Sequence, residues 1–164
     1  MKTLFIGGIK SGKSKNAEAY ILTHSTEKPI YLATNEFFDA EMHEKVQKHK
    51  KQRADNFITL EEPLKLTHTI QKTHAPVLVE CISMWINNML YHKYTQEQII
   101  EEIADMIALD AEIVFVINDV SCSVVSENKL VRKFVEINGR ISQLLASKCD
   151  KVFTTISGID VQIK

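Results

Sequence analysis

The feature that most limits how this chain can fold is an octapeptide near its amino terminus, Gly7-Gly8-Ile9-Lys10-Ser11-Gly12-Lys13-Ser14. It has the spacing G-x-x-x-x-G-K-[ST] and lies between an apolar run at 3–6 and a helix-compatible stretch that begins at Lys15. Strand, glycine loop and helix in this order form a cradle for phosphates, because glycines let backbone N–H groups turn inward toward an anion. Lys13 is expected to reach the terminal phosphates of a nucleotide, and the Ser14 hydroxyl to ligate Mg²⁺. The alternative, a glycine turn before a surface helix, does not account for the full spacing with both flanks.

Apolar, strand-like runs alternate with helical patterns along the rest of the chain, which is typical of an α/β fold. We expect strands at residues 2–6, 29–33, 76–80, 112–117 and 151–156, with a weaker one through 57–60. We expect helices at residues 13–23, 39–53, 82–92, 96–110 and 128–148. The end of the chain indicates a hairpin with its turn at Ser157-Gly158, so the last strand should run antiparallel. The predicted fold is a P-loop NTPase-type, mostly parallel α/β sheet flanked by helices, with a carboxyl-terminal antiparallel hairpin.

Composition and charge limit the class of protein further. No glycine/serine linker, internal repeat or low-complexity tract interrupts the 164 residues, so we expect one nucleotide-binding catalytic domain over 1–164. A net charge of -1 gives no general attraction to nucleic acid. Cys81, Cys122 and Cys149 are widely spaced without a CxxC pair, which favours reduced thiols over a disulfide frame or zinc site. No apolar run reaches the ~18 residues of a membrane span, and no cleavable signal precedes the first strand, so we expect a cytoplasmic protein.

Four stretches follow the expected parallel strands and should meet at the carboxyl edge of the sheet, where ligands bind in such folds. They are residues 7–14, 34–36, 80–83 and 118–121. Glu80 ends one apolar strand, and an acidic residue there can hold a magnesium ion in P-loop enzymes. Asp119, which follows the next strand along the chain, is a second candidate for the same role. The alternative for each acid is that it caps its strand and faces solvent.

A basic stretch at residues 46–53 is the second notable feature. On a helix, Val46, His49, Lys50 and Arg53 share one face. Such a face can bind phosphates, and nearby cations disfavour the imidazolium form, which keeps a histidine neutral and nucleophilic. The alternative is a solvated basic helix with an incidental histidine, and the spacing alone leaves both open.

Polar and aromatic residues between these stretches have more than one interpretation. Trp85 can stack on a planar ligand, although its helical spacing favours a place in the core. Asn87 and Asn88 are unusual among apolar neighbours, and one of them is a candidate to point into the crevice. The polar loop at 118–128 precedes a helix, and loops of this kind often close over substrates.

Several motifs together, in one order over nearly the whole chain, resemble a single enzyme family. They are Gly7-Gly8-x-x-Ser11-Gly12-Lys13-Ser14, Tyr31-Leu32-Ala33-Thr34, Gln47-x-His49-Lys50-x-x-Arg53, Glu80-Cys81-Ile82-Ser83 with Asn88, Glu127-Asn128-x-Leu130, Gly139-Arg140-x-x-Gln143 and Ser157-Gly158-Ile159. The chain is similar to the bifunctional adenosylcobinamide kinase / adenosylcobinamide-phosphate guanylyltransferases of cobalamin biosynthesis. The glycine loop is widespread, whereas the His-x-x-x-Arg stretch and the carboxyl-terminal motifs are much more specific.

The resemblance implies two reactions and a homotrimer. In the first, ATP or GTP phosphorylates the aminopropanol hydroxyl of adenosylcobinamide. In the second, a histidine attacks the α-phosphate of GTP, releases pyrophosphate and holds GMP covalently. The GMP then passes to adenosylcobinamide phosphate and gives adenosylcobinamide-GDP.

The resemblance also implies the residues of the site. The guanylylated histidine corresponds to His49. From the glycine loop and the strand-end acid we expect Lys13 to be the second catalytic residue, and Ser14 and Glu80 to hold Mg²⁺. The implied nucleotide contacts are Gly7, Gly8, Ile9, Lys10, Ser11, Gly12, Lys13, Ser14, Lys15, Ala33, Thr34, Asn35, Lys50, Lys51, Gln52, Arg53, Glu61 and Glu80. A neutral imidazole among cations suits attack on a polyphosphate, because the cations offset the charge that grows on the leaving pyrophosphate.

The chain also departs from the family pattern. Ser121-Cys122-Ser123 stands where the family usually has Gly-x-Gly, and a loop without glycine is less able to adopt positive φ. Other departures are Ser126 and Ala54 for proline, Phe57 for tryptophan and Lys48 for a second histidine. Two further functions stay open from the sequence: a P-loop kinase of small molecules without guanylyl transfer, and a non-catalytic nucleotide-binding regulatory module.

Overall fold

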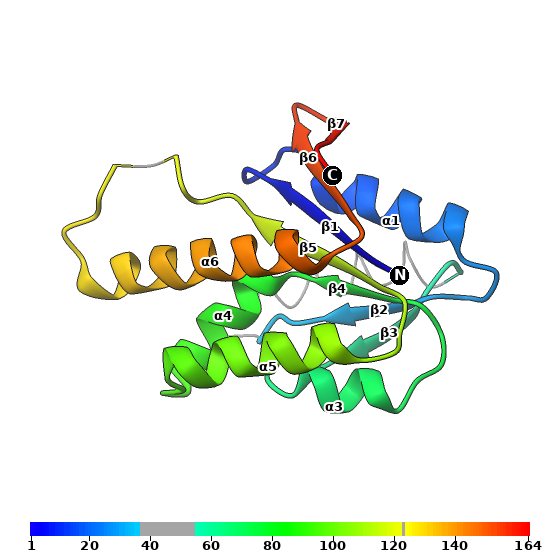
Figure 1. Cartoon of the computed structure of the whole chain (residues 1–164), viewed down its shortest axis with the longest axis horizontal. Coiled ribbons are helices and arrows are strands. Elements are labelled where there is room, and N and C mark those ends of the chain that lie inside the picture. Colours follow the sequence, from blue (N-terminus) through cyan, green and yellow to red (C-terminus); the bar gives the residue numbers. More distant parts are fainter. Residues whose placement is uncertain (37–54, 123) are drawn as a thin grey trace.

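A seven-stranded sheet forms the centre of the protein in a computed structural model, which describes residues 1–36, 55–122 and 124–164 (Figure 1). The strand order is β3-β2-β4-β5-β1-β6-β7. The strands are β1 (Lys2–Gly7), β2 (Ile30–Ala33), β3 (Ile58–Glu61), β4 (Val77–Glu80), β5 (Ile113–Asn118), β6 (Lys151–Ile156) and β7 (Ile159–Gln162). All neighbours pair in parallel except β6 and β7, which pair antiparallel. The predicted mostly parallel sheet with a terminal hairpin is confirmed.

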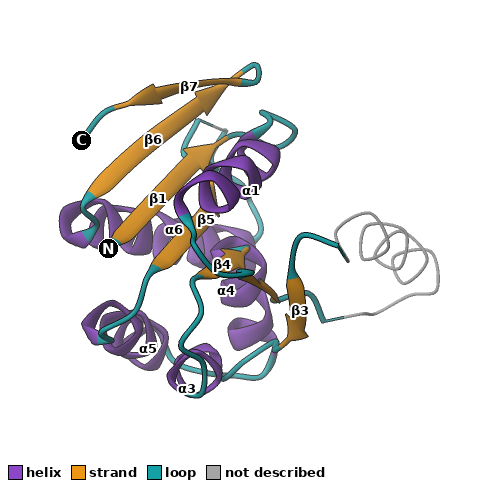
Figure 2. Cartoon of the chain, turned by 90° about the vertical axis from the view of Figure 1, so that its right-hand side faces the viewer, coloured by secondary structure: helices purple, strands orange, loops and turns teal. Residues whose placement is uncertain are grey.

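Helices cover both faces of the sheet. They are α1 (Lys13–His24), α3 (Leu66–Gln71), α4 (Ile82–Tyr91), α5 (Gln96–Ala108) and α6 (Lys129–Lys148). Figures 1 and 2 place α1 on one face and α3, α4, α5 and α6 on the other. Successive strand residues alternate between two buried clusters: Leu4 and Phe115 pack with α3 to α6, whereas Phe5 packs with α1. This period of two, with apolar residues at every position, is what a strand covered on both faces requires.

Local sequence explains where several elements begin and turn. The Thr95 hydroxyl accepts from the Gln98 N–H at the start of α5, and the Gln98 side chain accepts from the Thr95 N–H, a capping box. The Asn128 carboxamide oxygen accepts from two N–H groups in the first turn of α6. Ser157 and Gly158 have φ of 51° and 84°, so the predicted hairpin turn is of the type whose two central residues are left-handed.

The predicted elements agree with the observed ones to within about two residues, with two exceptions. Helix α3 was not predicted: it has only six residues, and its threonines and histidine have weak helix propensity. It forms because Leu66 and Ile70, one turn apart, are buried against the core. The predicted helix at 39–53 lies outside the described residues.

Candidate functional site

The glycine loop links β1 to α1 and has the geometry of a phosphate cradle. Gly7 ends β1, and a Cβ atom there would lie 2.5 Å from Ser11 Oγ and 2.7 Å from the Thr155 carbonyl oxygen. Gly12 has a φ of 98°, and a Cβ atom there would lie 3.0 Å from Gly158 Cα. Both positions therefore require glycine. Gly7 has no room for a side chain, and Gly12 combines a close contact with a left-handed backbone. The loop ends where α1 begins, so its N–H groups share the positive end of a helix.

Lys13 is the first residue of α1 and lies inside this loop. Its side chain is only 6% exposed, and Nζ donates to the Gly8 carbonyl oxygen at 3.3 Å. The ammonium group is thus held against the glycine loop at the amino-terminal end of α1. A buried cation beside a row of N–H donors forms a binding site for the terminal phosphates of a nucleotide.

The turn of the carboxyl-terminal hairpin packs against the outer side of the glycine loop. The Gly158 N–H donates to the Ser11 carbonyl oxygen at 2.7 Å. Asn16, in the first turn of α1, donates from Nδ2 to the Gly158 carbonyl oxygen at 3.0 Å. Inside the hairpin, the buried Thr155 hydroxyl donates to Asp160 Oδ1 at 2.5 Å. The sequence predicted the turn but not its contact with the loop, because the pairing of β6 with β1 is set by residues far apart in the chain.

Glu80 lies beside the glycine loop at the end of β4. The Ser14 hydroxyl donates to Glu80 Oε1 at 2.8 Å, which brings together the two residues predicted to hold Mg²⁺. The peptide bond between Glu80 and Cys81 is cis. Burial, followed by the neighbouring Glu80 carboxylate, raises the pKa of the Cys81 thiol to about 12, so this thiol stays protonated and neutral beside the site.

Asp119, the second candidate for the metal, has a different set of partners. Its Oδ1 atom accepts from the Ser121 hydroxyl at 2.5 Å and from the Ser121 N–H at 2.9 Å. These bonds lower the pKa of the Asp119 carboxyl group, the side-chain bond more than the backbone one. Its N–H donates to the Gly7 carbonyl oxygen at 2.9 Å, so the residue lies next to the loop while its carboxylate is engaged by Ser121. The contact with Ser14 favours Glu80 for the metal role.

The ends of β2 and β3 continue this edge of the sheet. Ala33 is in register with Glu80 on one side and with Glu61 on the other. Thr34 is fully buried, and its hydroxyl contacts the carbonyl oxygens of Glu80 and Cys81 at 3.2 and 2.9 Å. The structure therefore gathers the predicted residues at the ends of β1, β2, β3 and β4 on one edge, as the rule for parallel sheets requires.

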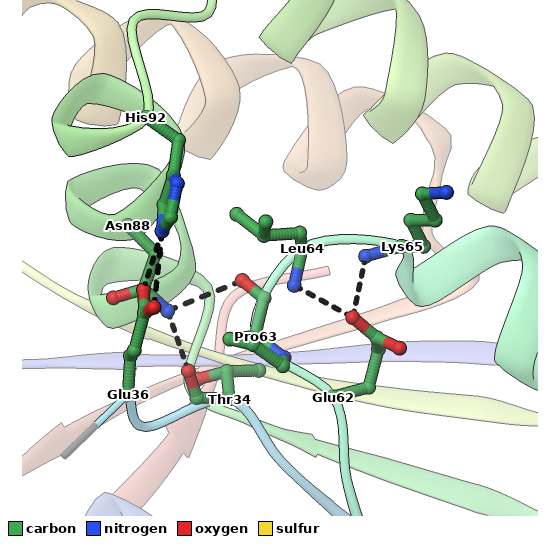
Figure 3. A network of polar contacts seen from close by, with 8 residues as sticks. All are labelled: Thr34, Glu36, Glu62, Pro63, Leu64, Lys65, Asn88 and His92. Carbon is green, nitrogen blue, oxygen red and sulfur yellow. Dashed lines mark hydrogen bonds and ion pairs between the residues drawn. The ribbon is translucent and has the colours of Figure 1, made fainter.

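Side chains of α4 hold the segments that follow β2 and β3 (Figure 3). Asn88 is fully buried, and Nδ2 donates to the Thr34 carbonyl oxygen at 2.6 Å and to the Pro63 carbonyl oxygen at 3.1 Å. One turn later, His92 Nε2 lies 2.9 Å from Glu36 Oε2. Asn88 therefore joins two segments of the site edge, whereas Asn87 is exposed. Trp85 is fully buried, and its indole N–H donates to the Leu64 carbonyl oxygen at 2.9 Å, which confirms its place in the core.

Other predicted site residues are placed less centrally or lie elsewhere. Ile9, Lys10 and Lys15 are exposed on the loop and the first turn of α1, and Asn35 is partly buried after β2. Ser121 and Cys122, in the loop without glycine, do not adopt positive φ. The predicted nucleophile and the cations near it lie outside the described residues: His49, Lys50, Lys51, Gln52 and Arg53.

A comparison with protein families decides which enzymes this arrangement belongs with. The model of the cobinamide kinase / cobinamide phosphate guanyltransferase family matches residues 3–163. The chain belongs to this family. The resemblance inferred from the sequence motifs is therefore confirmed, and with it the expected bifunctional class of enzyme.

Curated relatives from three bacteria match this chain over all or nearly all of their length. The bifunctional adenosylcobalamin biosynthesis protein CobU of Salmonella typhimurium is 35% identical over 183 residues, and the match covers 100% of both chains. The protein of the same description from Escherichia coli K12 is 32% identical, again over 100% of both chains. The bifunctional adenosylcobalamin biosynthesis protein CobP of Pseudomonas aeruginosa is 31% identical and is covered to 98%.

A solved structure supports the fold of this cobinamide kinase family member. An ATPase from the type III secretion system of pathogenic bacteria superposes with a TM-score of 0.53 at 10% identity, over 93% of this chain and 50% of the other. This likeness concerns the P-loop fold alone. None of the helices within residues 1–36, 55–122 and 124–164 is long and apolar enough to cross a lipid bilayer.

Proposed function

We propose that this chain phosphorylates adenosylcobinamide with the help of Lys13 and then transfers GMP to the product through His49. The observation that carries the proposal is the contact of the Ser14 hydroxyl with the Glu80 carboxylate beside Lys13, in a chain of this family. Lys13, the glycine loop and the Ser14–Glu80 pair together supply a cation, a row of N–H donors and two adjacent oxygen ligands at one phosphate position. A triphosphate bound there has its terminal phosphate ready for transfer.

In the kinase reaction, the hydroxyl oxygen of adenosylcobinamide attacks the γ-phosphorus of ATP or GTP. A phosphorus–oxygen bond forms to the acceptor, the bond from the γ-phosphorus to the bridging β-phosphate oxygen breaks as the nucleoside diphosphate leaves, and the hydroxyl proton passes to solvent. Lys13 offsets the charge on the transferring group, because its ammonium is buried over the loop that surrounds the phosphates. The loop N–H groups orient the phosphate chain without rearranging, since Gly158 and Asn16 hold the loop from outside.

Mg²⁺ fits the oxygen donors present beside this position. Ser14 Oγ and Glu80 Oε1 lie 2.8 Å apart, and hydroxyl and carboxylate oxygens are the hard ligands this ion takes in nucleotide sites. The ion supplies neutralisation of phosphate charge when it is bound. Ser14 and Glu80 would hold it from the protein side.

In the guanylyl transfer, His49 is the proposed nucleophile. Its ring nitrogen attacks the α-phosphorus of GTP, a nitrogen–phosphorus bond forms, and the bond to the β-phosphate oxygen breaks as pyrophosphate leaves. A phosphate oxygen of adenosylcobinamide phosphate then displaces the histidine. Lys50 and Arg53 suit the neutralisation of the leaving pyrophosphate, because the lysine ammonium supplies a positive charge and the arginine guanidinium binds phosphate in a bidentate manner. We also propose a homotrimer, for which light scattering of the purified protein gives the mass.

The decisive experiment incubates the protein with GTP labelled at the α-phosphate and then denatures it. We expect a covalent adduct that acid cleaves and alkali does not, as for a phosphoramidate. His49→Ala should abolish the adduct, whereas His43→Ala, a histidine six residues earlier, should retain it. No adduct on the wild-type protein, or a labelled His49→Ala, would refute the histidine mechanism.

A second variant separates the kinase from the transferase. Lys13→Ala should abolish phosphorylation of adenosylcobinamide by ATP, and full retained activity would overturn the role of this lysine. Wild-type protein that phosphorylates the corrinoid without forming the adduct would be a kinase alone. Nucleotide binding without turnover of any corrinoid would favour the regulatory module.

A further inference from the structure

A crevice runs between the loop that follows β5 and the first half of α6. It consists of three adjoining cavities of about 350, 270 and 370 Å³. All three are lined by Val135, and Asp119 and Val120 line both the first and the third. Each cavity alone is near the lower end of the ~300–1,000 Å³ range of ligand pockets. Joined end to end, they offer a site for a ligand broader than a nucleotide.

The 270 Å³ cavity of this α6 crevice has apolar walls that face solvent. Val124 is 93% exposed, Val125 is 80% exposed and Val131 is 43% exposed, and all three line the 270 Å³ cavity. Exposed apolar side chains gathered around a hollow mark a surface that another molecule covers. The neighbouring helix residue Leu130 is 61% exposed but does not line any of the three cavities.

The inner part of the α6 crevice presents carboxamides. Asn138 is buried and fixed, because its Oδ1 accepts from the Ser83 hydroxyl at 2.7 Å and its Nδ2 donates to the Asn118 carbonyl oxygen at 2.9 Å. Gln143, one turn further along α6, lines the same cavity and makes no side-chain hydrogen bond within the part of the chain that the structure describes. Its amide is thus available to both a donor and an acceptor on a ligand.

The crevice opens beside the glycine loop. Ile9, a loop residue that is 77% exposed, lines the 370 Å³ cavity together with Asp119. The Asp119 N–H in turn donates to the Gly7 carbonyl oxygen at 2.9 Å. Figure 1 shows the loop after β5 and the start of α6 extending past the same end of the sheet at which β1 enters the glycine loop. A ligand in the crevice therefore lies beside the glycine loop.

We propose that the α6 crevice binds the corrinoid acceptor, with its apolar rim on the valines and its peripheral carboxamides toward Gln143; this inference rests on the proposed function. A corrinoid is a broad macrocycle that carries methyl groups around its edge and primary amides at the ends of its side chains. The crevice has the same mixture, apolar walls with a free carboxamide, and its 370 Å³ cavity, which Ile9 lines, adjoins the phosphate loop. The hydroxyl arm of the acceptor then points toward Lys13 and Ser14.

The test uses steady-state kinase assays in which adenosylcobinamide and ATP are varied separately. The double variant Val131→Ser, Val135→Ser should raise the KM for adenosylcobinamide by roughly tenfold or more, because two apolar contacts are lost. The KM for ATP at saturating adenosylcobinamide should stay within about twofold, and so should the amount of GMP adduct formed from labelled GTP in the absence of any corrinoid. Leu130→Ser is the matched control on the same helix and should leave the corrinoid KM near that of the wild type.

Gln143→Ala tests the polar end with little risk to folding, since the side chain is exposed. We expect its corrinoid KM to rise by roughly fivefold, with Ser147→Ala, one turn further along, as its control. The proposal is overturned if both crevice variants keep the wild-type corrinoid KM, or if Leu130→Ser raises it as much. If the rise in corrinoid KM is accompanied by a change in the mass of the assembly, the crevice is a contact between copies of the chain, and the proposal is also overturned.

Failure of the proposed function gives a different result. If wild-type protein neither phosphorylates the corrinoid nor forms the adduct, the enzyme proposal fails by itself. Equilibrium dialysis with adenosylcobinamide, followed by its visible absorbance, then still tests the crevice: binding that the double variant loses supports the site, and binding that it keeps refutes it.

Discussion

Asn16 donates a hydrogen bond to the carbonyl oxygen of Gly158 at 3.0 Å, although 142 residues separate the two in the sequence. Gly158 in turn donates from its N–H to the Ser11 carbonyl oxygen at 2.7 Å. The turn of the last hairpin is therefore part of the phosphate loop, because it fixes one carbonyl of the loop and the first turn of α1. Nucleotide affinity should depend on the last strands of the sheet as well as on the glycine motif.

Asn16→Ala removes the side-chain half of this link without changing the backbone. We expect the KM for ATP to rise by about fivefold, the factor that corresponds to a hydrogen bond of roughly 1 kcal/mol. The kcat should change by less than about twofold, since the loop reaches the same geometry once nucleotide is bound. Asn87→Ala, at an exposed position of α4, serves as the control. An unchanged KM in Asn16→Ala would contradict the link.

Glu80→Gln keeps the shape of the side chain and removes its charge. If Glu80 holds Mg²⁺ with Ser14, kcat of the kinase reaction should fall by roughly 100-fold and the Mg²⁺ concentration for half-maximal rate should rise. Asp119→Asn should change either quantity by less than about threefold, because the Asp119 carboxylate is engaged by Ser121. Magnesium titrations of the two variants decide between the acids, and the reverse order of effects would assign the metal to Asp119.

The sequence was sufficient to locate those site residues whose positions depend only on their neighbours along the chain. The spacing from Gly7 to Ser14 fixes a loop between a strand and a helix, and this requires no knowledge of distant residues. Glu80 could be added because the ends of parallel strands meet at one edge. The expectation that Ser14 and Glu80 serve the same ion followed from these two facts, and the Ser14 hydroxyl donates to Glu80 Oε1 at 2.8 Å.

The remaining contacts depend on how distant elements pack. The role of Gly158 requires β6 to lie beside β1. The order of strands in the sheet cannot be inferred from the residues of either strand. The sequence marks Asn87 and Asn88 as a pair of which one is a candidate to point into the crevice, yet their spacing shows neither which one is buried nor which backbone groups it meets. Helix α3 was missed because burial of two apolar residues outweighs the weak propensity of so short a segment.

Asn88→Ala should destabilise the protein because it removes one buried and one partly buried hydrogen bond. Thr34 and Pro63 would each keep a carbonyl oxygen without this donor, so we expect the free energy of unfolding to fall by about 2 to 4 kcal/mol. Urea denaturation followed by circular dichroism measures this change. The adjacent Asn87→Ala should fall within about 0.5 kcal/mol of the wild type, since Asn87 is exposed. Equal effects of the two substitutions would be incompatible with the network in Figure 3.

The three cysteines should differ in reactivity toward a thiol reagent. All three are free, as expected, with Cys122 exposed and the other two buried. Burial, followed by the nearby Glu80 carboxylate for Cys81 and the Asp150 carboxylate for Cys149, raises the pKa of each of these thiols to about 12. At pH 8 in native buffer we therefore expect one thiol to react quickly, and three after unfolding in urea. The substitution Cys122→Ser should remove the fast reaction.

The same raised pKa values predict how stability changes in alkali. An unfolded thiol ionises near pH ~8.5, whereas the folded Cys81 and Cys149 hold their protons to a pKa of about 12. The folded state thus binds more protons in this interval, so the stabilisation is complete below pH ~8.5 and is lost as the pH rises toward 12. Cys149→Ala should make the decline in unfolding free energy between pH 9 and 11 shallower, as measured by urea denaturation at each pH, whereas Cys122→Ser should leave its slope unchanged. A slope in Cys149→Ala equal to that of the wild type would show that this thiol ionises alike in both states.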